Sequence, residues 1–454
     1  MKYHLFQLKL FFMYSFLGVL LLLISSIGWA QDPNKDINYL EVVNEILRTN
    51  LDILSSILNE EMAYHRLQSE RHALVPTLSA GGEFFRNSGQ TQSSTGQIFR
   101  DLNFSRYQPQ VSLNFNLNIG EQLYLSRSAW NEYESSRFQI SDTRQKILLI
   151  VSELYQKLLL SREGIRIAEQ LTQNSSQVFN IIRSRTEAGV ALTSDMIQIQ
   201  AKLASNKEQI VKAKNQWVQV SIQLAHLLRW DPNINLIPSE VLIPQPSVYQ
   251  VLRSLSPEFQ VAERPDIKAA RWASVAADEQ KKATQWDFWG PSLSLRAAYI
   301  QLGDKTNNLD SGERYFTALS WDFSWSDWDQ IKVQSRKADL ARVQLEKLND
   351  QARAEILEAT QDIKATLERI PLAKESLTAE EDTLKLIIAR YLAGKTLLID
   401  VLLAQDRLAQ AQLNAAKTIA AYNLAQMNYL AAVGQLDRTT LFELYQVQYD
   451  GVER

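Results

Sequence analysis

The sequence contains the stretch Ala188-Gly189-Val190-Ala191-Leu192-Thr193-Ser194-Asp195 and, farther along, its counterpart Ala393-Gly394-Lys395-Thr396-Leu397-Leu398-Ile399-Asp400. The two glycines and the two aspartates are separated by the same interval, because 394 − 189 and 400 − 195 both equal 205. Leu203 and Leu408 keep this interval a few helical turns later. A constant offset of this kind indicates a tandem duplication.

Each glycine stretch follows a very long helical pattern. Apolar residues at helical spacing run from about Ser126 to Arg185 and again from about Val333 to Tyr391. Roughly 60 residues at 1.5 Å each correspond to about 90 Å of helix, far more than an ordinary globular helix. Gly164 and Pro371 lie at matching places in the two patterns, where they predict a kink or a change in packing.

Shorter helices are predicted before and after the long ones. Apolar spacing predicts one helix over residues 38 to 72 and others over 197 to 228 and 398 to 433, directly after the glycine stretches. A proline-rich segment joins the two halves. The predicted divisions are a signal peptide (1–30), a first repeat (31–230), a linker (231–263), a second repeat (264–435) and a tail (436–454).

Between the helices the apolar period changes to two, which predicts strands. The clearest alternation covers Val111 to Ile119, and its counterpart covers Tyr315 to Trp325. Weaker alternation over Leu74 to Phe84 and Pro291 to Tyr299 predicts a partner strand in each half. Polar, turn-rich segments join the strands of each pair and are predicted to be exposed loops: Asn87 to Ser105 and Gly303 to Gly312.

The N-terminus predicts export. Residues 1–30 combine basic Lys2 and Lys9, an apolar run from Phe11 to Ile24 and a small residue, Ala30, before the expected cleavage point. An uncleaved membrane anchor is the alternative, because the apolar run approaches spanning length. No other stretch of about 20 apolar residues follows, so the mature chain could enter a membrane only as strands.

Composition excludes several kinds of protein. Of the 454 residues, 45% are apolar and 22% charged, which is a globular balance, and the absence of cysteine excludes disulfides and thiolate metal sites. The formal net charge of −3 becomes −5 when Lys2 and Lys9 leave with the signal, too mild to indicate a nucleic-acid partner. The mature chain has only His65, His72 and His226, and it has no phosphate-binding glycine loop. We therefore expect neither an enzyme nor a cofactor or metal site.

Four strands cannot close a membrane barrel, because unpaired backbone groups at an open edge in lipid cost several kcal/mol each. Three copies would supply twelve strands, with apolar residues facing lipid and the Asn and Ser residues facing an aqueous lumen. We therefore expect a homotrimer in contact with membrane lipids. Aromatic residues support this expectation as a membrane-interface belt, the alternative being packing within a soluble sheet: Trp286, Trp289, Trp321, Trp325 and Trp328.

Four groups of segments then carry a family resemblance. They are Leu40-Glu41-Val42-Val43 through Asn50-Leu51-Asp52, the strand entries Leu74-Val75-Pro76 and Trp289-Gly290-Pro291-Ser292-Leu293-Ser294, Arg264-Pro265-Asp266-Ile267, and the two glycine stretches. Together they resemble the TolC-like trimeric outer membrane efflux proteins over essentially the whole mature chain. The resemblance implies a mainly α protein with a small β part, whose trimer forms a twelve-stranded transmembrane barrel continuous with a periplasmic α-helical barrel.

The resemblance also implies a function. Such proteins are passive exit ducts of tripartite efflux or type I secretion systems in the outer membrane of Gram-negative-type cells, with a long periplasmic portion. They dock to a periplasmic adaptor and an inner membrane pump of the RND or ABC type. The alternative is an exported coiled-coil scaffold or adaptor without a pore, which explains the helices but not the strands. Dedicated metal export is disfavoured, because the chain has only five methionines and no thioether pathway.

In the family the helical hairpin tips form the tunnel entrance and contact the adaptor. This comparison selects eight residues here: Gly189, Leu192, Asp195, Gly394, Lys395, Thr396, Leu397 and Asp400. An acidic residue at the position of Asp400 rings the narrowest point in the family, whereas helix capping is the alternative role for both aspartates. The glycines are expected to adopt positive φ in tight turns. The family's second acidic residue corresponds to Leu403 here and its arginine to Thr396, so these two positions depart from the pattern.

Overall fold

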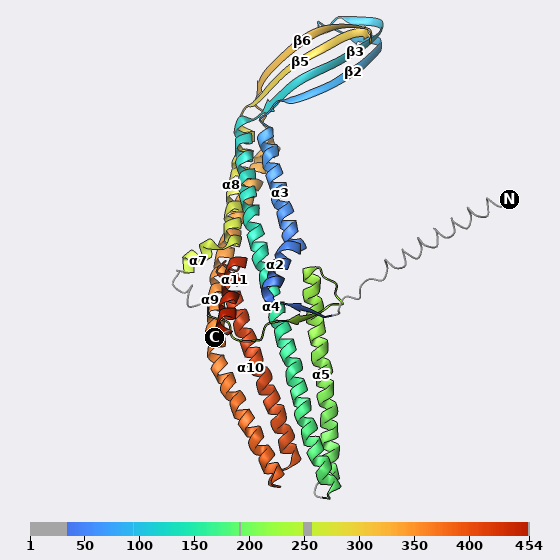
Figure 1. The fold of residues 1–454 in the computed structure, drawn as a ribbon. Coiled ribbons are helices and arrows are strands. Elements are labelled where there is room, and N and C mark those ends of the chain that lie inside the picture. The colour runs from blue at the N-terminus through green and yellow to red at the C-terminus, as the bar shows by residue number, and fades with distance from the viewer. Residues whose placement is uncertain (1–33, 94, 190–191, 248–256, 453–454) are drawn as a thin grey trace, which may run out of the picture.

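The computed structural model describes residues 34–93, 95–189, 192–247 and 257–452. In these segments, long helices carry a curved four-stranded sheet at one end and finish as two hairpins at the other (Figure 1). The predicted signal peptide, residues 1–30, lies outside the described residues. Among the described helices, none has a stretch both long and apolar enough to cross a bilayer.

One order of elements occurs twice: a helix, two strands, a long helix and a returning helix. The first set is α3 (Leu51–His72), β2 (Thr77–Gln92), β3 (Ile98–Leu117), α4 (Ile119–Glu187) and α5 (Thr193–Leu228). The second set is α8 (Pro265–Trp289), β5 (Ser292–Lys305), β6 (Asn308–Ser320), α9 (Trp325–Leu392) and α10 (Leu398–Ala432). Outside the two sets lie β1 (Asn34–Ile37), α2 (Tyr39–Thr49), β4 (Asn235–Pro238), α7 (Pro257–Glu263) and α11 (Arg438–Val452).

The two long helices are confirmed. Helix α4 has 69 residues and α9 has 68, so each exceeds the predicted length at its N-terminal end. Gly164 and Pro371 lie inside these helices without ending them. Both helices are therefore continuous through these positions, and the kink or change in packing stays a prediction.

The prediction of one helix over residues 38 to 72 is wrong, because Asn50 divides it into α2 and α3. Asn50 has an extended backbone (φ −67°, ψ 133°), and its Oδ1 accepts hydrogen bonds from the N–H groups of Asp52 (2.9 Å) and Ile53 (3.2 Å). Its own N–H donates to the carbonyl of Ile46 (3.1 Å), so one residue ends α2 and caps α3. The apolar spacing continues across the break and therefore did not reveal it.

The two predicted loops between strands are also wrong. The four-stranded sheet has the order β2-β3-β5-β6, with every pair antiparallel, and pairing continues far into both segments. Asn87 pairs with Phe104, and Lys305 pairs with Asn308 at the end of the second hairpin. Polar composition indicates contact with water, but it does not prevent an adjacent strand from satisfying the backbone groups.

The second strand of the second half ends earlier than predicted. Strand β6 ends at Ser320, and Trp325 is the first residue of α9 rather than the last of a strand. The Oγ of Ser324 accepts from the N–H of Ser326 (3.2 Å) and caps the helix. This cap ends the extended chain even though aromatic residues continue to alternate up to Trp325.

The β1–β4 pair, α7 and α11 were not predicted. Strand β1 pairs in parallel with β4, beginning with Asn34 opposite Asn235, and the C-terminal tail contains α11. Both belong to the largest core, in which the ring of Tyr39 stacks on that of Tyr445 at 4.3 Å. The Tyr39 hydroxyl is 2.6 Å from that of Ser152 on α4. The predicted linker and tail therefore help to form the middle of the molecule.

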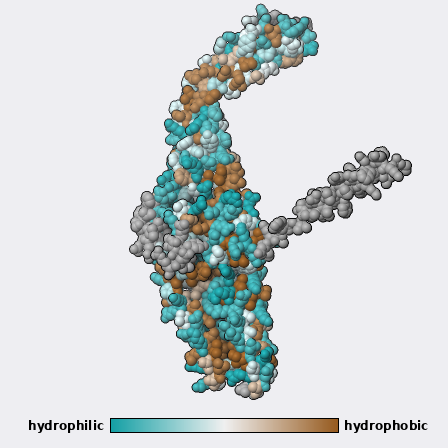
Figure 2. Space-filling view, viewed as in Figure 1, coloured by the Kyte–Doolittle hydropathy of each residue, from teal (hydrophilic) through white to brown (hydrophobic). Residues whose placement is uncertain are grey.

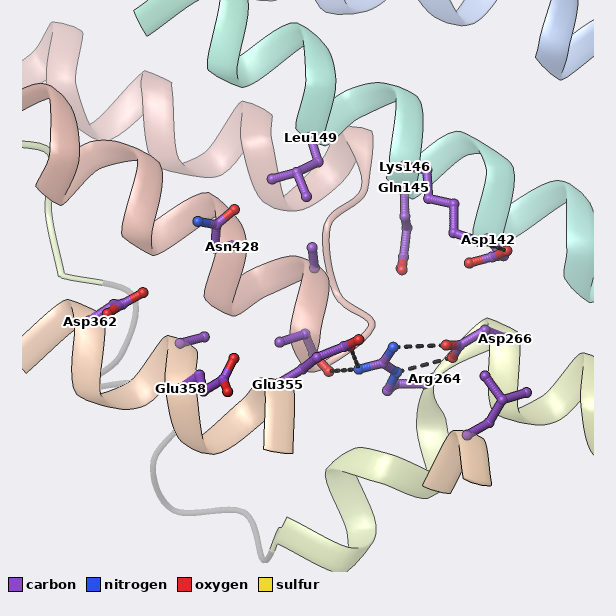
Figure 3. A pocket seen from close by; sticks show the side chains of 14 residues that line it. Asp142, Gln145, Lys146, Leu149, Arg264, Asp266, Glu355, Glu358, Asp362 and Asn428 are labelled. Carbon is purple, nitrogen blue, oxygen red and sulfur yellow. Dashed lines mark hydrogen bonds and ion pairs between the residues drawn. The ribbon is translucent and has the colours of Figure 1, made fainter. Parts of the chain in front are cut away.

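Arg264 fixes the start of α8 against two other helices (Figure 3). Its guanidinium donates to Asp266 (2.7 Å), to Glu355 of α9 (2.7 Å) and to the carbonyl of Ala432 at the end of α10 (3.1 Å). Burial opposes ionisation of Asp266, but the hydrogen bonds and charge of Arg264 hold its pKa below the usual value. The Arg-Pro-Asp segment therefore has a structural role at the opening of the second set of elements.

Candidate functional site

The hairpin tips turn at Gly189 and Gly394. Their φ angles are +75° and +70°, which confirms the predicted positive φ at both positions. The second turn is closed by hydrogen bonds from Gly394 N–H to the Tyr391 carbonyl and from Lys395 N–H to the Arg390 carbonyl, both 2.9 Å. No atom lies within 4 Å of a Cβ added at either glycine, so backbone conformation rather than space favours glycine here.

Asp400 caps the helix that leaves the second tip. Its carboxylate accepts hydrogen bonds from the hydroxyl of Thr396 and from the N–H of Leu397 (3.2 Å). These two bonds, the Thr396 bond first, lower the pKa of Asp400, so it is ionised at neutral pH. The predicted capping role is confirmed for Asp400, while its place in a ring of carboxylates stays a prediction.

Asp195 lies beside a tyrosine of the other hairpin. The pKa of Tyr391 is raised by burial and then by the charge of Asp195, whereas Arg185 acts in the opposite direction. The guanidinium carbon of Arg185 is 5.7 Å from the centre of the Tyr391 ring, within the range of a cation–π contact. The two tips are thus linked by groups from α4, α5 and α9.

Tyr391 and Arg185 were not among the predicted site residues. Tyr391 precedes Gly394 by three residues, and Arg185 precedes Gly189 by four, so both occupy the last turn before a tip. The duplication could have indicated them, because equivalent helix ends finish at the same level of the molecule (Figure 1).

Two leucines stand at the N-caps of the returning helices. Leu192 precedes α5 and Leu397 precedes α10, and their exposed fractions are 69% and 70%. Neither offers the side-chain oxygen that usually occupies this position. Lys395 is exposed and Thr396 is half-buried beside them. The end of the molecule therefore presents a matched pair of apolar side chains to its surroundings.

Above the tips, the two hairpins contact each other along a seam that combines apolar and polar groups. Lys202 Nζ of α5 is 2.5 Å from Asp406 Oδ1 of α10. Farther in, Ser175 donates to the side chain of Gln405 (2.9 Å) and accepts from Asn206 (2.9 Å). Buried apolar residues complete the seam: Val178, Ile182, Ile199, Leu398, Val401 and Leu402.

The four-stranded sheet has its apolar face on the outside of its curve. Apolar side chains that point from this face are very exposed, with fractions of 76% for Tyr315 and 70% for Leu78. On the other face Ser112 is only 4% exposed, so this face is concave. The concave face holds a hollow lined by Gln110 and Asn114, among other polar residues from all four strands. A sheet in a soluble protein usually buries its apolar face, whereas this sheet exposes it.

The predicted interface tryptophans gather where the sheet meets the helices, and most lie on helices rather than strands. Trp286 and Trp289 are in the last turn of α8, Trp325 and Trp328 are in the first turn of α9, and Trp321 lies between β6 and α9. Figure 2 shows hydrophobic residues concentrated at this junction. Their position at a membrane surface stays a prediction.

Aromatic packing holds the junction together. The ring of Phe288 lies 4.7 Å from that of Trp289, 5.8 Å from that of Phe323 and 6.0 Å from that of Trp328. A Cβ added at Gly120 would lie 2.4 Å from the indole of Trp286, so these two positions fit closely together. Trp286 therefore packs α8 against α4.

A protonatable carboxyl lies just below the junction. Burial, followed by the charge and hydrogen bond of Asp287 and the charge of Glu70, raises the pKa of Glu121 to about 7. The amide of Gln122 donates to the Glu70 carboxylate at 2.8 Å. Across the described part of the chain, no three His, Asp or Glu side chains are grouped so that they could hold a metal ion.

Comparison with known proteins gives a consistent result. The family model described as "Outer membrane efflux protein" matches residues 42–228 and 260–435, which is well over half of the chain. The pyoverdine export outer membrane protein OpmQ of Pseudomonas putida is 22% identical over 392 residues, covering 82% of this chain and 81% of that protein. The outer membrane protein TolC of Vibrio cholerae is 20% identical over 431 residues, covering 93% and 94%.

Solved structures share the fold. The outer-membrane channel OprN superimposes with a TM-score of 0.79 at 18% identity, covering 87% of this chain and 90% of that one. The outer membrane protein VceC of Vibrio cholerae gives a TM-score of 0.78 at 18% identity, covering 87% and 96%. The order of helices and strands described above is therefore shared with these channels.

Proposed function

This chain belongs to the outer membrane efflux protein family and is an efflux channel of the outer membrane, and we propose that it works as a homotrimeric exit duct. The duct receives substrates from a periplasmic adaptor and an inner membrane pump of the RND or ABC type. It conducts them passively to the exterior. Its helices form the periplasmic portion and its sheets form the part within the outer membrane.

The four-stranded sheet is inverted relative to a sheet in a soluble protein, because its apolar face points outward. This inverted sheet is the observation that carries the proposal. Its convex apolar face fits lipid, and its concave polar face fits an aqueous lumen. Strands β2 and β6 are the outer strands of the sheet, so each has one free edge in a single chain. In a membrane both edges need partners, and neighbouring copies can supply them.

Exposed apolar residues on the helices support assembly as well. On α3, Leu51, Leu54 and Leu58 are all exposed at helical spacing, and α9 carries a longer row. The row on α9 includes Leu340, Val343, Leu357, Leu367, Leu372 and Leu386. Apolar surfaces of this extent usually mark an interface, and the neighbouring copies of a trimer would cover them.

The tips form the entrance and the adaptor contact in this proposal. Leu192 and Leu397 would insert into apolar pockets of the adaptor, because they are exposed and paired at the end of the molecule. Gly189 and Gly394 shape the turns that present them, and Lys395 and Thr396 flank the second tip. Asp195 and Asp400 place negative charge around the opening.

Single-channel recording of the detergent-extracted protein, with its mass measured by light scattering, tests the whole proposal. We expect trimers that give discrete conductance steps in a planar bilayer. A monomer that forms no channel would contradict the proposal and favour a coiled-coil scaffold.

Asp400 allows a sharper test of the entrance. Three ionised carboxylates around one axis attract cations, so Asp400→Asn should lower cation selectivity while retaining an acceptor for the helix cap. Asp400→Ala should change selectivity equally and destabilise the tip as well. Unchanged ion selectivity in both purified trimers would contradict a ring of carboxylates at this position.

A further inference from the structure

Two arginines of the concave face have no acidic partner. Arg296 of β5 and Arg314 of β6 both line the hollow, and neither forms an ion pair with any residue in the described segments. In the β5–β6 register Arg314 lies opposite Ala298, two residues from Arg296. The arginines are therefore diagonal neighbours on one face, at a separation of about 7–8 Å between backbone positions.

The surroundings of the two arginines suit an anion. The Arg296 guanidinium donates to the side-chain oxygen of Gln110 (3.2 Å), which leaves most of its N–H groups available. Asn114 lies opposite Arg296 in the β3–β5 register, and its amide donates to the hydroxyls of Ser79 (3.1 Å) and Ser112 (3.1 Å), so it places no negative charge beside the guanidinium group. The charged residues lining the hollow are these two arginines and Glu83, so its formal charge is +2 − 1 = +1 per chain.

An apolar group completes the hollow. Phe316 lies directly opposite Arg296 in the β5–β6 register and lines the same space. Guanidinium groups bind carboxylate, phosphate and sulfonate oxygens in pairs, and the aromatic ring can contact a carbon skeleton. The combination fits a small organic anion.

We propose that Arg296 and Arg314 form a basic belt on the lumen wall, which favours the passage of organic anions. The proposal rests on the proposed function, because the concave face lines a lumen only in the assembled trimer. Three copies contribute six guanidinium groups to the belt. At about 7 Å in water, one unit charge changes the local concentration of a monovalent anion by about threefold.

Single-channel recording in a KCl gradient tests the belt. Arg296→Gln and Arg314→Gln should each lower the chloride-to-potassium permeability ratio by roughly seven- to ninefold, because the lost charge lowers the local anion concentration and raises the local cation concentration by about threefold each; the double variant should lower it by more. Arg86→Gln is the matched control, because Arg86 belongs to the same sheet but extends from its convex face, two residues from Phe84. We expect this control to keep the ratio of the unmodified channel.

Citrate is the probe for binding in the unmodified channel. Added on the side of the sheet, it should reduce the current at concentrations that have less effect from the side of the tips, where Asp400 repels anions. The double variant should lose this inhibition, whereas Arg86→Gln should keep it.

The outcomes separate the two proposals. Conducting trimers that show no sided inhibition by citrate, or a double variant with unchanged selectivity and inhibition, would overturn the basic belt alone. An unmodified protein that never conducts would overturn the proposed function and the belt with it. The citrate experiment needs no substitution, so it decides the matter even if a variant fails to assemble.

Discussion

Gly189 and Gly394 occupy a backbone region that residues with a Cβ rarely adopt. Both positions are open, so a larger side chain would meet no neighbour, and any cost of substitution comes from the backbone alone. The same chain contains Gly164 inside α4, where helical φ suits any residue and nothing lies within 4 Å of an added Cβ. All three glycines have open surroundings, but only Gly189 and Gly394 have positive φ. Substitution at Gly394 and at Gly164 therefore separates the energetic cost of the backbone conformation from the cost of a steric clash.

Gly394→Val should strain the second tip by about 1–2 kcal/mol, because it forces a β-branched residue into positive φ. We expect reduced efflux and weaker crosslinking to the adaptor in cells. Gly164→Ala is the control and should raise thermal stability slightly, since alanine favours helix by about 1 kcal/mol over glycine. Normal efflux with normal crosslinking in Gly394→Val would argue against a constrained turn.

Glu121 makes stability depend on pH near neutrality. Its folded pKa of about 7 lies above the ordinary value of 4.5, so the unfolded chain loses this proton first as pH rises. Stability is therefore reduced progressively between about pH 4.5 and pH 7.

Glu121→Gln should stabilise the protein at pH 8 by about 1 kcal/mol and have little effect at pH 4, after allowance for partial exposure of the group to solvent. Thermal unfolding at the two pH values measures this difference. Glu61→Gln, at an exposed position of α3, should show no comparable gain at pH 8. Equal effects of Glu121→Gln at both pH values would contradict the raised pKa.

At the scale of elements, the two hairpins are joined by a seam in which charge and apolar packing occur together. Lys202 and Asp406 form its partly buried ion pair, and the apolar cluster lies between this pair and the tips. The hairpins can separate only if the ion pair breaks and the apolar cluster is exposed to water.

Charge reversal tests this seam. Lys202→Glu places two carboxylates together, so it should loosen the seam and increase single-channel conductance. The double variant Lys202→Glu with Asp406→Lys restores the attraction and should return conductance toward the original value. If the double variant conducts as the single one does, the ion pair does not hold the hairpins.

The sequence predicted which elements exist better than where they end. Long apolar periods identify α4 and α9 because many residues report the same spacing, whereas one residue such as Asn50 can divide a helix without altering the period. Ser324 acts similarly when it caps α9 inside an alternating aromatic run. A helix cap depends on the hydrogen bonds of one residue, whereas the apolar period is judged over many residues, so the period does not reveal the cap.

The candidate site was predicted only in part for a related reason. The duplication drew attention to the glycines and aspartates of the tips, and Asp400 does cap its helix. Tyr391 and Arg185 escaped notice, because their contact joins different hairpins and depends on the tertiary arrangement. The β1–β4 pair escaped for the same reason, since short strands far apart in the chain carry no period.

At the scale of the whole molecule, the inverted sheet requires a surrounding medium that differs between its two faces. Leu78 and Ser79 are adjacent in β2, and both are exposed in a single chain, but they point to opposite faces. They provide a matched pair for testing which face meets lipid.

Leu78→Lys should reduce membrane assembly modestly, because Leu78 is the second residue of β2, near the sheet–helix junction, and lysine on the lipid face of a barrel costs about 0–1 kcal/mol near the interface, against about 2–4 kcal/mol in the middle of the bilayer. Ser79→Lys adds the same charge to the concave face and should be tolerated. The amount of trimer recovered from outer membranes measures both effects. Greater loss with Ser79→Lys than with Leu78→Lys would mean that the faces are assigned the wrong way round.

The parallel pairing of β1 with β4 also constrains the order in which the chain can mature. Asn34 and Asn235 are 201 positions apart, and β2, β3, α4 and α5 all lie between them. A ribosome and an export apparatus deliver the chain from its N-terminus, so β1 must wait, unpaired, until about two hundred later residues have emerged. Closure of this long loop is slow compared with local helix formation. Strand β1 thus emerges before the first set of elements but reaches its final place only after that set has emerged, and during that delay it is available to any factor that escorts the newly exported chain.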